Sequence, residues 1–286
     1  MATLTGLLVL LIGAALVGAL VSAARSRPTA ADLAWLTGDP APPADETDVA
    51  TRYLRRHRTY PVVGALTGVS LAVVVGIRWY GSLVVGVGGR SPLADPLFLG
   101  LTGVVVGALV AESFRLPRPR GPVQASLAPR TGGAGAGHVR AARATTGAAA
   151  LVTVADVVRA AVVGDGASVA TGTAVTLLLG AAVVGLAELT RARVVGRRRP
   201  VLSPRATRLD ERLRAFATAS VAHLELAAAV LTLAWVVSAA SLLPGDGEWL
   251  GVVAVVAGLV VAVVQLRAAR PRPPRTARLR DPAVRA

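Results

Sequence analysis

Apolar residues along this chain gather in seven blocks of roughly 20 residues without polar alternation, the length an α-helix needs to cross about 30 Å of hydrocarbon. The blocks are residues 4–24, 61–80, 96–114, 144–163, 169–189, 216–243 and 249–266. Soluble domains also reach the hydrophobic fraction of 53% found here. The grouping of the apolar residues into long blocks, rather than their total number, therefore indicates a membrane protein. The pattern predicts an all-α, polytopic membrane protein with seven transmembrane helices.

The positions of the arginines predict the orientation of these helices. The sequence contains 31 arginines and no lysine. Twenty-eight of them follow alternate blocks: six in residues 25–60, six in 115–143, nine in 190–214 and seven after 266. Positively charged segments stay in the cytoplasm. We therefore expect a protein of the plasma (cytoplasmic) membrane with its N-terminus outside and its C-terminus in the cytoplasm.

The first block is predicted to be an uncleaved anchor helix. Arg25 and Arg27 follow its apolar run and no positive charge precedes it, which is the reverse of the polarity of a signal peptide. The predicted organisation is an anchor over residues 1–24, a cytoplasmic loop over 25–60, a six-helix membrane domain over 61–266 and a basic tail over 267–286.

An internal repeat groups the last six blocks into three helical hairpins. The third and fifth blocks end in Glu-x-x-Arg at Glu112 and Glu188, and the seventh ends at Gln265, with spacings of 76 and 77 residues. A Leu-x-Pro-Arg motif follows the third block and again the fifth. Self-similarity at a fixed period indicates a repeated unit, although low-complexity Ala/Val/Gly sequence gives similar matches. We predict three parallel hairpins that enter and leave the membrane on the cytoplasmic side.

The loop over residues 25–60 has an acidic part and a basic part. Residues 30–46 are acidic and rich in proline, so we expect little fixed structure there. Residues 47–58 carry four arginines and predict a short basic helix lying on anionic lipids of the inner leaflet. Binding of a protein partner by the cytoplasmic loops is the alternative. The glycine-rich residues 131–138 lack the GxxxxGK[ST] pattern and are predicted to be a linker.

Four ionisable residues within the predicted spans form the candidate site: Asp156, Arg159, His223 and Glu225. Ionisable groups inside a membrane are costly and are candidate functional positions. If the fourth and sixth helices touch, the four side chains form either a proton relay, ion site or gate, or a structural clamp between helices. His223 and Glu225 are two positions apart and face different sides of a helix, which argues against one shared site.

The other acidic residues of the spans have basic residues one helical turn away. Arg115 follows Glu112 by three positions and Arg191 follows Glu188 by three, and residues three apart share a helix face. Arg159 stands in the same relation to Asp156. These acids are therefore predicted to be neutralised within their own helices.

Small residues four apart occur in the second and third blocks, as Gly64 and Gly68, then Gly103 and Gly107. This spacing allows close approach of two helix backbones. We expect packing within the chain rather than a dimer contact.

No catalytic, metal or cofactor motif is found in the sequence. With no cysteine, thiolate chemistry is excluded, and the three histidines lack a metal-ligand spacing. The net charge of +15 is explained by topology, so no nucleic-acid partner is expected. The expected partners are the lipid bilayer, anionic lipids and proteins at the cytoplasmic loops.

The arginine-only basic composition, the Glu-x-x-Arg span ends and the Leu-x-Pro-Arg motif resemble the uncharacterised small polytopic membrane proteins of high-GC actinobacteria. This resemblance covers about the last three quarters of the chain and implies no activity. The expected function is that of a non-enzymatic membrane component, a scaffold or assembly subunit. The alternative is a small proton- or ion-coupled transporter or channel that uses the buried polar residues.

Overall fold

The computed structural model describes residues 13–15, 17–23, 25, 27–80, 92–114, 135–164, 167–196, 204–240 and 248–272. All regular structure in these ranges is helical. The α-helices are α2 (Ala30–Thr37), α3 (Ala44–Val75), α4 (Pro96–Glu112), α5 (Ala136–Val163), α6 (Ala167–Val195), α7 (Pro204–Ala239) and α8 (Glu248–Ala268). A π-helical segment, η1 (Gly76–Tyr80), continues α3, and a 3-10 turn, η2 (Pro92–Ala94), precedes α4.

Five of the described helices are long and apolar enough to cross a membrane, namely α3 with its extension, α5, α6, α7 and α8. By helix length and hydropathy, the chain is a multi-pass helical membrane protein. The third predicted span forms α4, which has 17 residues. The first predicted span lies partly outside the described residues and contains an apolar helix over Gly13–Ala23. The helical membrane class is therefore confirmed, and helix length supports five of the seven predicted spans.

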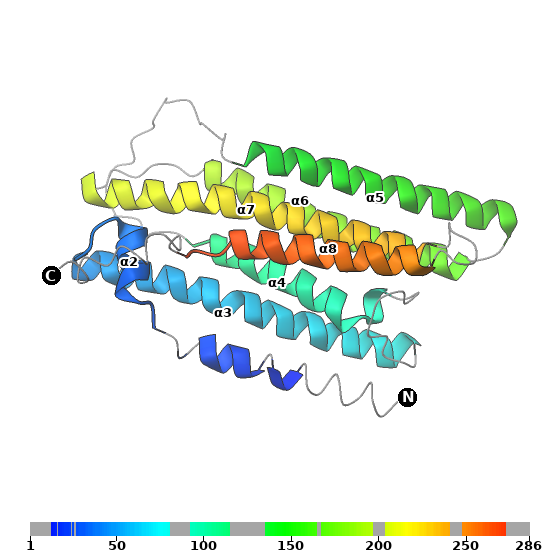
Figure 1. Cartoon of the computed structure of the whole chain (residues 1–286), viewed down its shortest axis with the longest axis horizontal. Helices are drawn as coiled ribbons and strands as arrows, with labels where there is room; N and C mark the ends of the chain where they lie inside the picture. Colours follow the sequence, from blue (N-terminus) through cyan, green and yellow to red (C-terminus); the bar gives the residue numbers. More distant parts are fainter. Residues whose placement is uncertain are drawn as a thin grey trace.

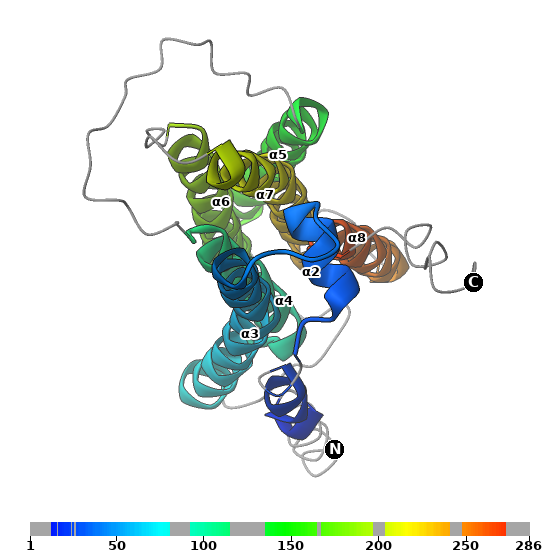
Figure 2. The same ribbon diagram turned by 90° about the vertical axis from the view of Figure 1, so that its left-hand side faces the viewer.

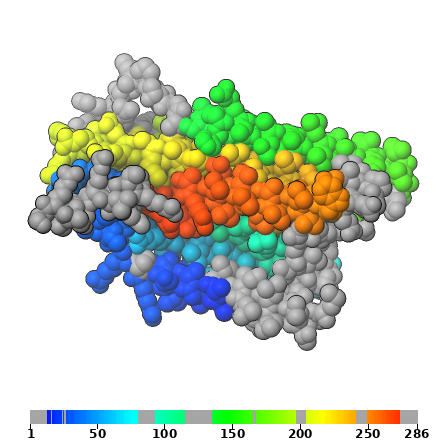
Figure 3. Space-filling model, in the orientation of Figure 1, coloured from blue at the N-terminus to red at the C-terminus, as the bar shows by residue number. Residues whose placement is uncertain are grey.

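The helices form an elongated bundle with α7 at its centre (Figures 1 and 2). α7 packs against α4, α5, α6 and α8. In its most apolar part 72% of the residues are buried, against at most 33% in the other long helices. The outer helices expose apolar side chains: Figure 3 shows α8 lying along the surface, where Val252, Val256 and Val260 are exposed. This apolar perimeter is the surface expected next to lipid tails.

Consecutive helices run antiparallel and form three hairpins, α3–α4, α5–α6 and α7–α8 (Figure 1). The first helix of each hairpin begins at the end of the bundle where α2 lies, which we call the α2 end. The second helix of each hairpin returns to that end. The Arg/Pro-rich connections, the glycine-rich loop up to residue 134 and the tail from 273 lie outside the described residues.

The prediction of little fixed structure in residues 30–46 is wrong for residues 30–37, which form α2, and for residues 44–46, which begin α3. Thr29 and Asp32 make a capping box at its start, each side chain accepting from the backbone N–H of the other. Gly38 ends the helix in the left-handed conformation at φ 73°. These local signals satisfy backbone groups at both ends, which outweighs the acidic composition.

The basic residues 47–58 are helical, but they belong to α3, which continues through Pro61 into the second span. A proline inside a helix removes one backbone hydrogen bond. The helix continues here with α4 packed on both sides of the proline: Glu112 contacts Tyr53 before Pro61, and Gly103 meets Gly64 after it.

A second hydrophobic core lies at the α2 end, beyond the apolar part of the bundle. Its buried members are Leu36 of α2, Ala50, Tyr53 and Leu54 of α3, and Leu209 and Leu213 of α7. Trp35 and Phe216 pack against it with their rings edge to face at 5.9 Å. The polar extensions of α3 and α7 thus fold together with α2 into a unit that we call the platform.

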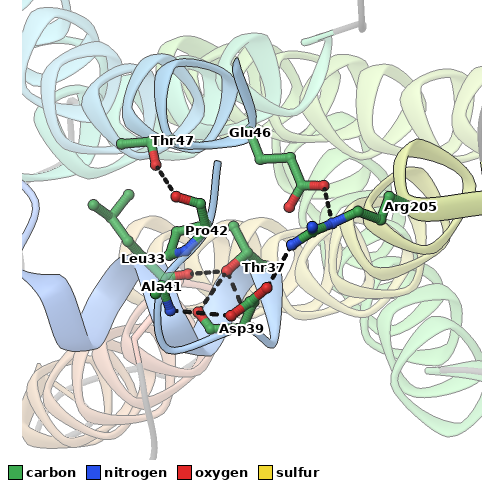
Figure 4. A network of polar contacts seen from close by, with 8 residues as sticks. All are labelled: Leu33, Thr37, Asp39, Ala41, Pro42, Glu46, Thr47 and Arg205. Atoms are coloured by element: carbon green, nitrogen blue, oxygen red, sulfur yellow. Dashed lines mark hydrogen bonds and ion pairs between the residues drawn. The ribbon is translucent and has the colours of Figure 1, made fainter. Parts of the chain in front are cut away.

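Ion pairs connect the acidic α2–α3 connection to α7 at the edge of the platform (Figure 4). Arg205 at the start of α7 contacts both Asp39 and Glu46, the latter at 3.1 Å. The Thr37 hydroxyl donates to the Leu33 carbonyl oxygen and accepts from the Asp39 N–H, which fixes the turn after α2. The acidic segment therefore neutralises platform arginines.

The glycines of α3 and α4 bring the two helix backbones into direct contact. A Cβ atom at Gly64 would lie 2.0 Å from the Gly103 carbonyl oxygen, and one at Gly107 would lie 2.1 Å from the Tyr60 carbonyl oxygen. Gly68 meets the Leu99 carbonyl oxygen in the same way. The prediction of packing within the chain is confirmed.

Candidate functional site

Each hairpin is joined near the α2 end by a polar contact that uses one of the three repeat-related residues. Glu112 Oε2 lies 3.6 Å from His57 Nε2 of α3. Glu188 Oε1 lies 2.6 Å from Arg143 Nη2 of α5. The third contact joins His223 Nδ1 of α7 to Oε1 of Gln265 at 2.6 Å. The second helix of each hairpin therefore places a side-chain oxygen atom next to a guanidinium or imidazole group on the first.

The contact in the first hairpin is buried among aromatic rings. The Glu112 side chain is fully enclosed, and the Tyr53 hydroxyl donates to its Oε2 at 3.3 Å. The rings of Tyr53 and His57 lie 4.4 Å apart, and Phe114 and Phe216 pack edge to face on that of Tyr53. The partner predicted for Glu112, Arg115, lies outside the described residues.

Glu188 is held by two arginines from different helices. Arg191 of α6 donates to Oε2, and Arg143 Nε of α5 donates to Oε1 at 2.7 Å. The contact between Arg191 and Glu188 is the one predicted from their spacing of three positions on one helix. The exposed fraction of the side chain is 28% for Glu188 and 60% for Arg143. The ion pair therefore lies at the edge of the bundle.

Glu225 of α7 faces the same group from inside the bundle. Its side chain is completely buried, and neither carboxylate oxygen has a hydrogen-bond partner in the described part of the chain. The charged groups around it are Glu188, Arg191 and Arg143. Each arginine donates a hydrogen bond to Glu188, and within the described residues no donor reaches the deeper carboxylate.

Asp156 of α5 lies farther along the bundle. The Thr173 hydroxyl of α6 donates to its Oδ2 at 3.0 Å, and Arg159 Nε lies 3.9 Å from its Oδ1. The carboxylate is fully buried, while a third of the Arg159 side chain is exposed. The predicted neutralisation by Arg159 is thus present, supplemented by a hydroxyl from the neighbouring helix.

The four residues of the predicted cluster lie in three separate places. Asp156 and Arg159 contact each other and α6, Glu225 faces Glu188, and His223 faces Gln265 on the other side of α7. Arg143, which lies near Glu225, precedes Asp156 by 13 positions on α5, a separation of about 20 Å at 1.5 Å per residue. The two carboxylates belong to different levels of the bundle.

Four contacts between polar side chains could not be read from the sequence as pairs. Besides Tyr53 and His57 with Glu112, the Trp235 indole N–H donates to Asp95 Oδ2 at 2.9 Å. The rings of His138 and His223 lie 4.3 Å apart. These partners are far apart in sequence, so only the packing of α3 on α4, and of α7 on its neighbours, brings them together.

No group of three or more His, Cys, Asp or Glu side chains that could hold a metal ion occurs among the described residues. Comparison with known proteins found no matching family model, curated protein or solved structure. The polar groups described above are therefore the basis for inferring a function.

Proposed function

We propose that this chain is a non-enzymatic component of the cytoplasmic membrane whose platform receives a partner on the cytoplasmic side. The observation that supports it is the second hydrophobic core, which extends α3 and α7 beyond their apolar parts. An α-helical bundle needs no such extension to cross a bilayer. Exposed arginines of these helices can face anionic lipids or an acidic protein surface: Arg55, Arg208 and Arg212.

The orientation is tested by labelling single cysteines, since the natural chain contains none. Arg55 is exposed on the platform, and Ser168 is exposed at the opposite end, at the start of α6. A membrane-impermeant maleimide added to intact cells is expected to label Ser168→Cys but not Arg55→Cys, and permeabilisation should allow both to react. Labelling of Arg55→Cys in intact cells would contradict a cytoplasmic platform.

The partner is tested with the same two variants carrying a photo-crosslinker in native membranes. We expect a discrete cross-linked protein or lipid product from position 55 and none from position 168. Equal products from both positions, or none from either, would count against a receiving platform.

A small proton-coupled transporter is the second candidate function. It is favoured by polar residues of α5, α6 and α7 that are buried, apart from the partly exposed Glu188. These residues are Glu188, Glu225, Thr232, Thr176 and Asp156. The Thr232 side chain faces Gly180, and Thr173 reaches Asp156 from the same helix as Thr176. Polar residues along one seam between membrane helices are typical of proton paths.

Glu225→Gln separates the two candidates. A transporter is expected to lose pH-dependent flux in proteoliposomes while its amount and monodispersity stay normal. A structural component is expected to show no flux in either form and at most a lower melting temperature. If folded Glu225→Gln retains pH-dependent flux, transport does not depend on the buried Glu225 carboxyl group, and the second candidate function loses its structural support.

A further inference from the structure

We propose that Glu225 is a proton-binding site at the α5–α6–α7 seam, loaded through Glu188 from the α2 end. This inference rests on the second candidate function, transport coupled to protons. It starts from one juxtaposition: a completely buried carboxylate without a hydrogen-bond donor beside a carboxylate that is partly exposed.

The charges around Glu225 favour a proton over a metal ion. Arg143 comes from α5, and Glu188 and Arg191 come from α6; of the charged groups identified around Glu225 in the described residues, none comes from α2, α4 or α8, which also pack on α7. Two guanidinium groups repel a metal cation. A proton instead removes the charge of the buried carboxylate, which would otherwise pay a large desolvation cost without any donor to offset it.

The hydrogen bonds of Glu188 explain why the proton belongs on Glu225. Glu188 accepts from Arg143 and Arg191, one on each oxygen, and both bonds favour its ionised form. Glu225 has neither bond. With one proton between the two carboxyl groups, the ionised member is therefore Glu188 and the neutral member is Glu225.

The exposure of the group gives the direction of loading. The side chains of Arg143 and Glu188 are partly exposed on the half of the bundle toward the α2 end (Figure 1), whereas Glu225 has no exposed surface. A proton from that side meets Glu188 first and then passes to the Glu225 carboxylate, forming one O–H bond there and restoring the ionised Glu188. No other reactant is needed for this step.

The test is infrared spectroscopy of the full chain in lipid nanodiscs, which distinguishes the carbonyl stretch of a protonated carboxylic acid from the bands of carboxylates. The expected result is a carboxylic-acid band in mildly acidic buffer, where exposed carboxylates are ionised, and its loss as pH rises. Glu225→Gln should remove that component. Glu211→Gln, which changes an exposed carboxylate on the same helix, should leave it unchanged.

An unchanged band in folded Glu225→Gln, or no such band in the natural protein, would overturn the proposal. If Glu225→Gln does not fold, Glu188→Gln provides the second variant: it keeps the buried acid but removes its partner, so the pH at which the band disappears should shift. No shift would equally contradict loading through Glu188. If the band behaves as expected but no flux is measured, Glu225 is a proton-binding site and the transport function is rejected. If flux is measured but the band is absent, transport stands and the proton site at Glu225 is rejected.

Discussion

Gly64→Val is expected to force α3 and α4 apart and to destabilise the whole bundle. The added Cβ would meet the Gly103 carbonyl oxygen, a backbone atom 2.0 Å away that cannot move without its helix. Overpacking in a tight core costs typically 1–3 kcal/mol, and we expect about 3 kcal/mol here, because the contact is with backbone. Thermal unfolding in detergent should show a melting temperature lower by about 5–10 °C.

Gly147→Val is the matched control for this prediction. Gly147 lies in α5, and a Cβ atom there would have no neighbour within 4 Å. Both variants place the same β-branched residue in an apolar helix, so they share its conformational cost. Equal melting temperatures for the two variants would show that the α3–α4 contact is not close in the native protein.

Asp95→Ala is expected to destabilise the opposite end of the bundle. The Asp95 carboxylate caps α4 by accepting from the Leu97 N–H at 2.8 Å and also accepts from the buried Trp235 indole. Loss of an N-cap costs about 1 kcal/mol, and an unsatisfied buried donor costs about 1–3 kcal/mol. We therefore expect a total loss of about 2–4 kcal/mol in the free energy of unfolding.

Asp95→Asn tests whether the destabilisation comes from the loss of the hydrogen-bond acceptor at position 95 or from any substitution there. The amide oxygen can still accept from the Leu97 N–H or from Trp235, so this variant should melt between the natural protein and Asp95→Ala. Chemical denaturation followed by tryptophan fluorescence measures all three proteins. If alanine and asparagine destabilise equally, the hydrogen bonds contribute little and the negative charge itself is required.

The sequence predicted the features that depend on neighbouring residues. The apolar blocks predict membrane helices because the length and hydropathy of a single segment decide whether it can cross a bilayer. Arg191 contacts Glu188 because three positions separate them on one helix. The error at α2 was also local: Thr29 and Asp32 fit the capping-box pattern, which the acidic, proline-rich composition obscured.

The features that sequence could not supply depend on which helix faces which. Tyr53 and Glu112 are 59 positions apart, and Asp95 and Trp235 are 140 apart. The grouping of Asp156 with Glu225 was a reasonable hypothesis from their helices alone. The structure separates them because Arg143, rather than Asp156, is the residue of α5 that lies beside Glu188 and Glu225.

The central position of α7 has a consequence for how this protein is made. Chains fold from the N-terminus during synthesis, so the hairpins α3–α4 and α5–α6 emerge before the helix that both of them pack against. Until α7 is synthesised, much of the surface that it later covers faces lipid or other proteins. Assembly of the complete bundle therefore waits for the penultimate helix, and the earlier hairpins must persist in the bilayer through their own internal contacts, of which the glycine seam of α3 and α4 is the closest.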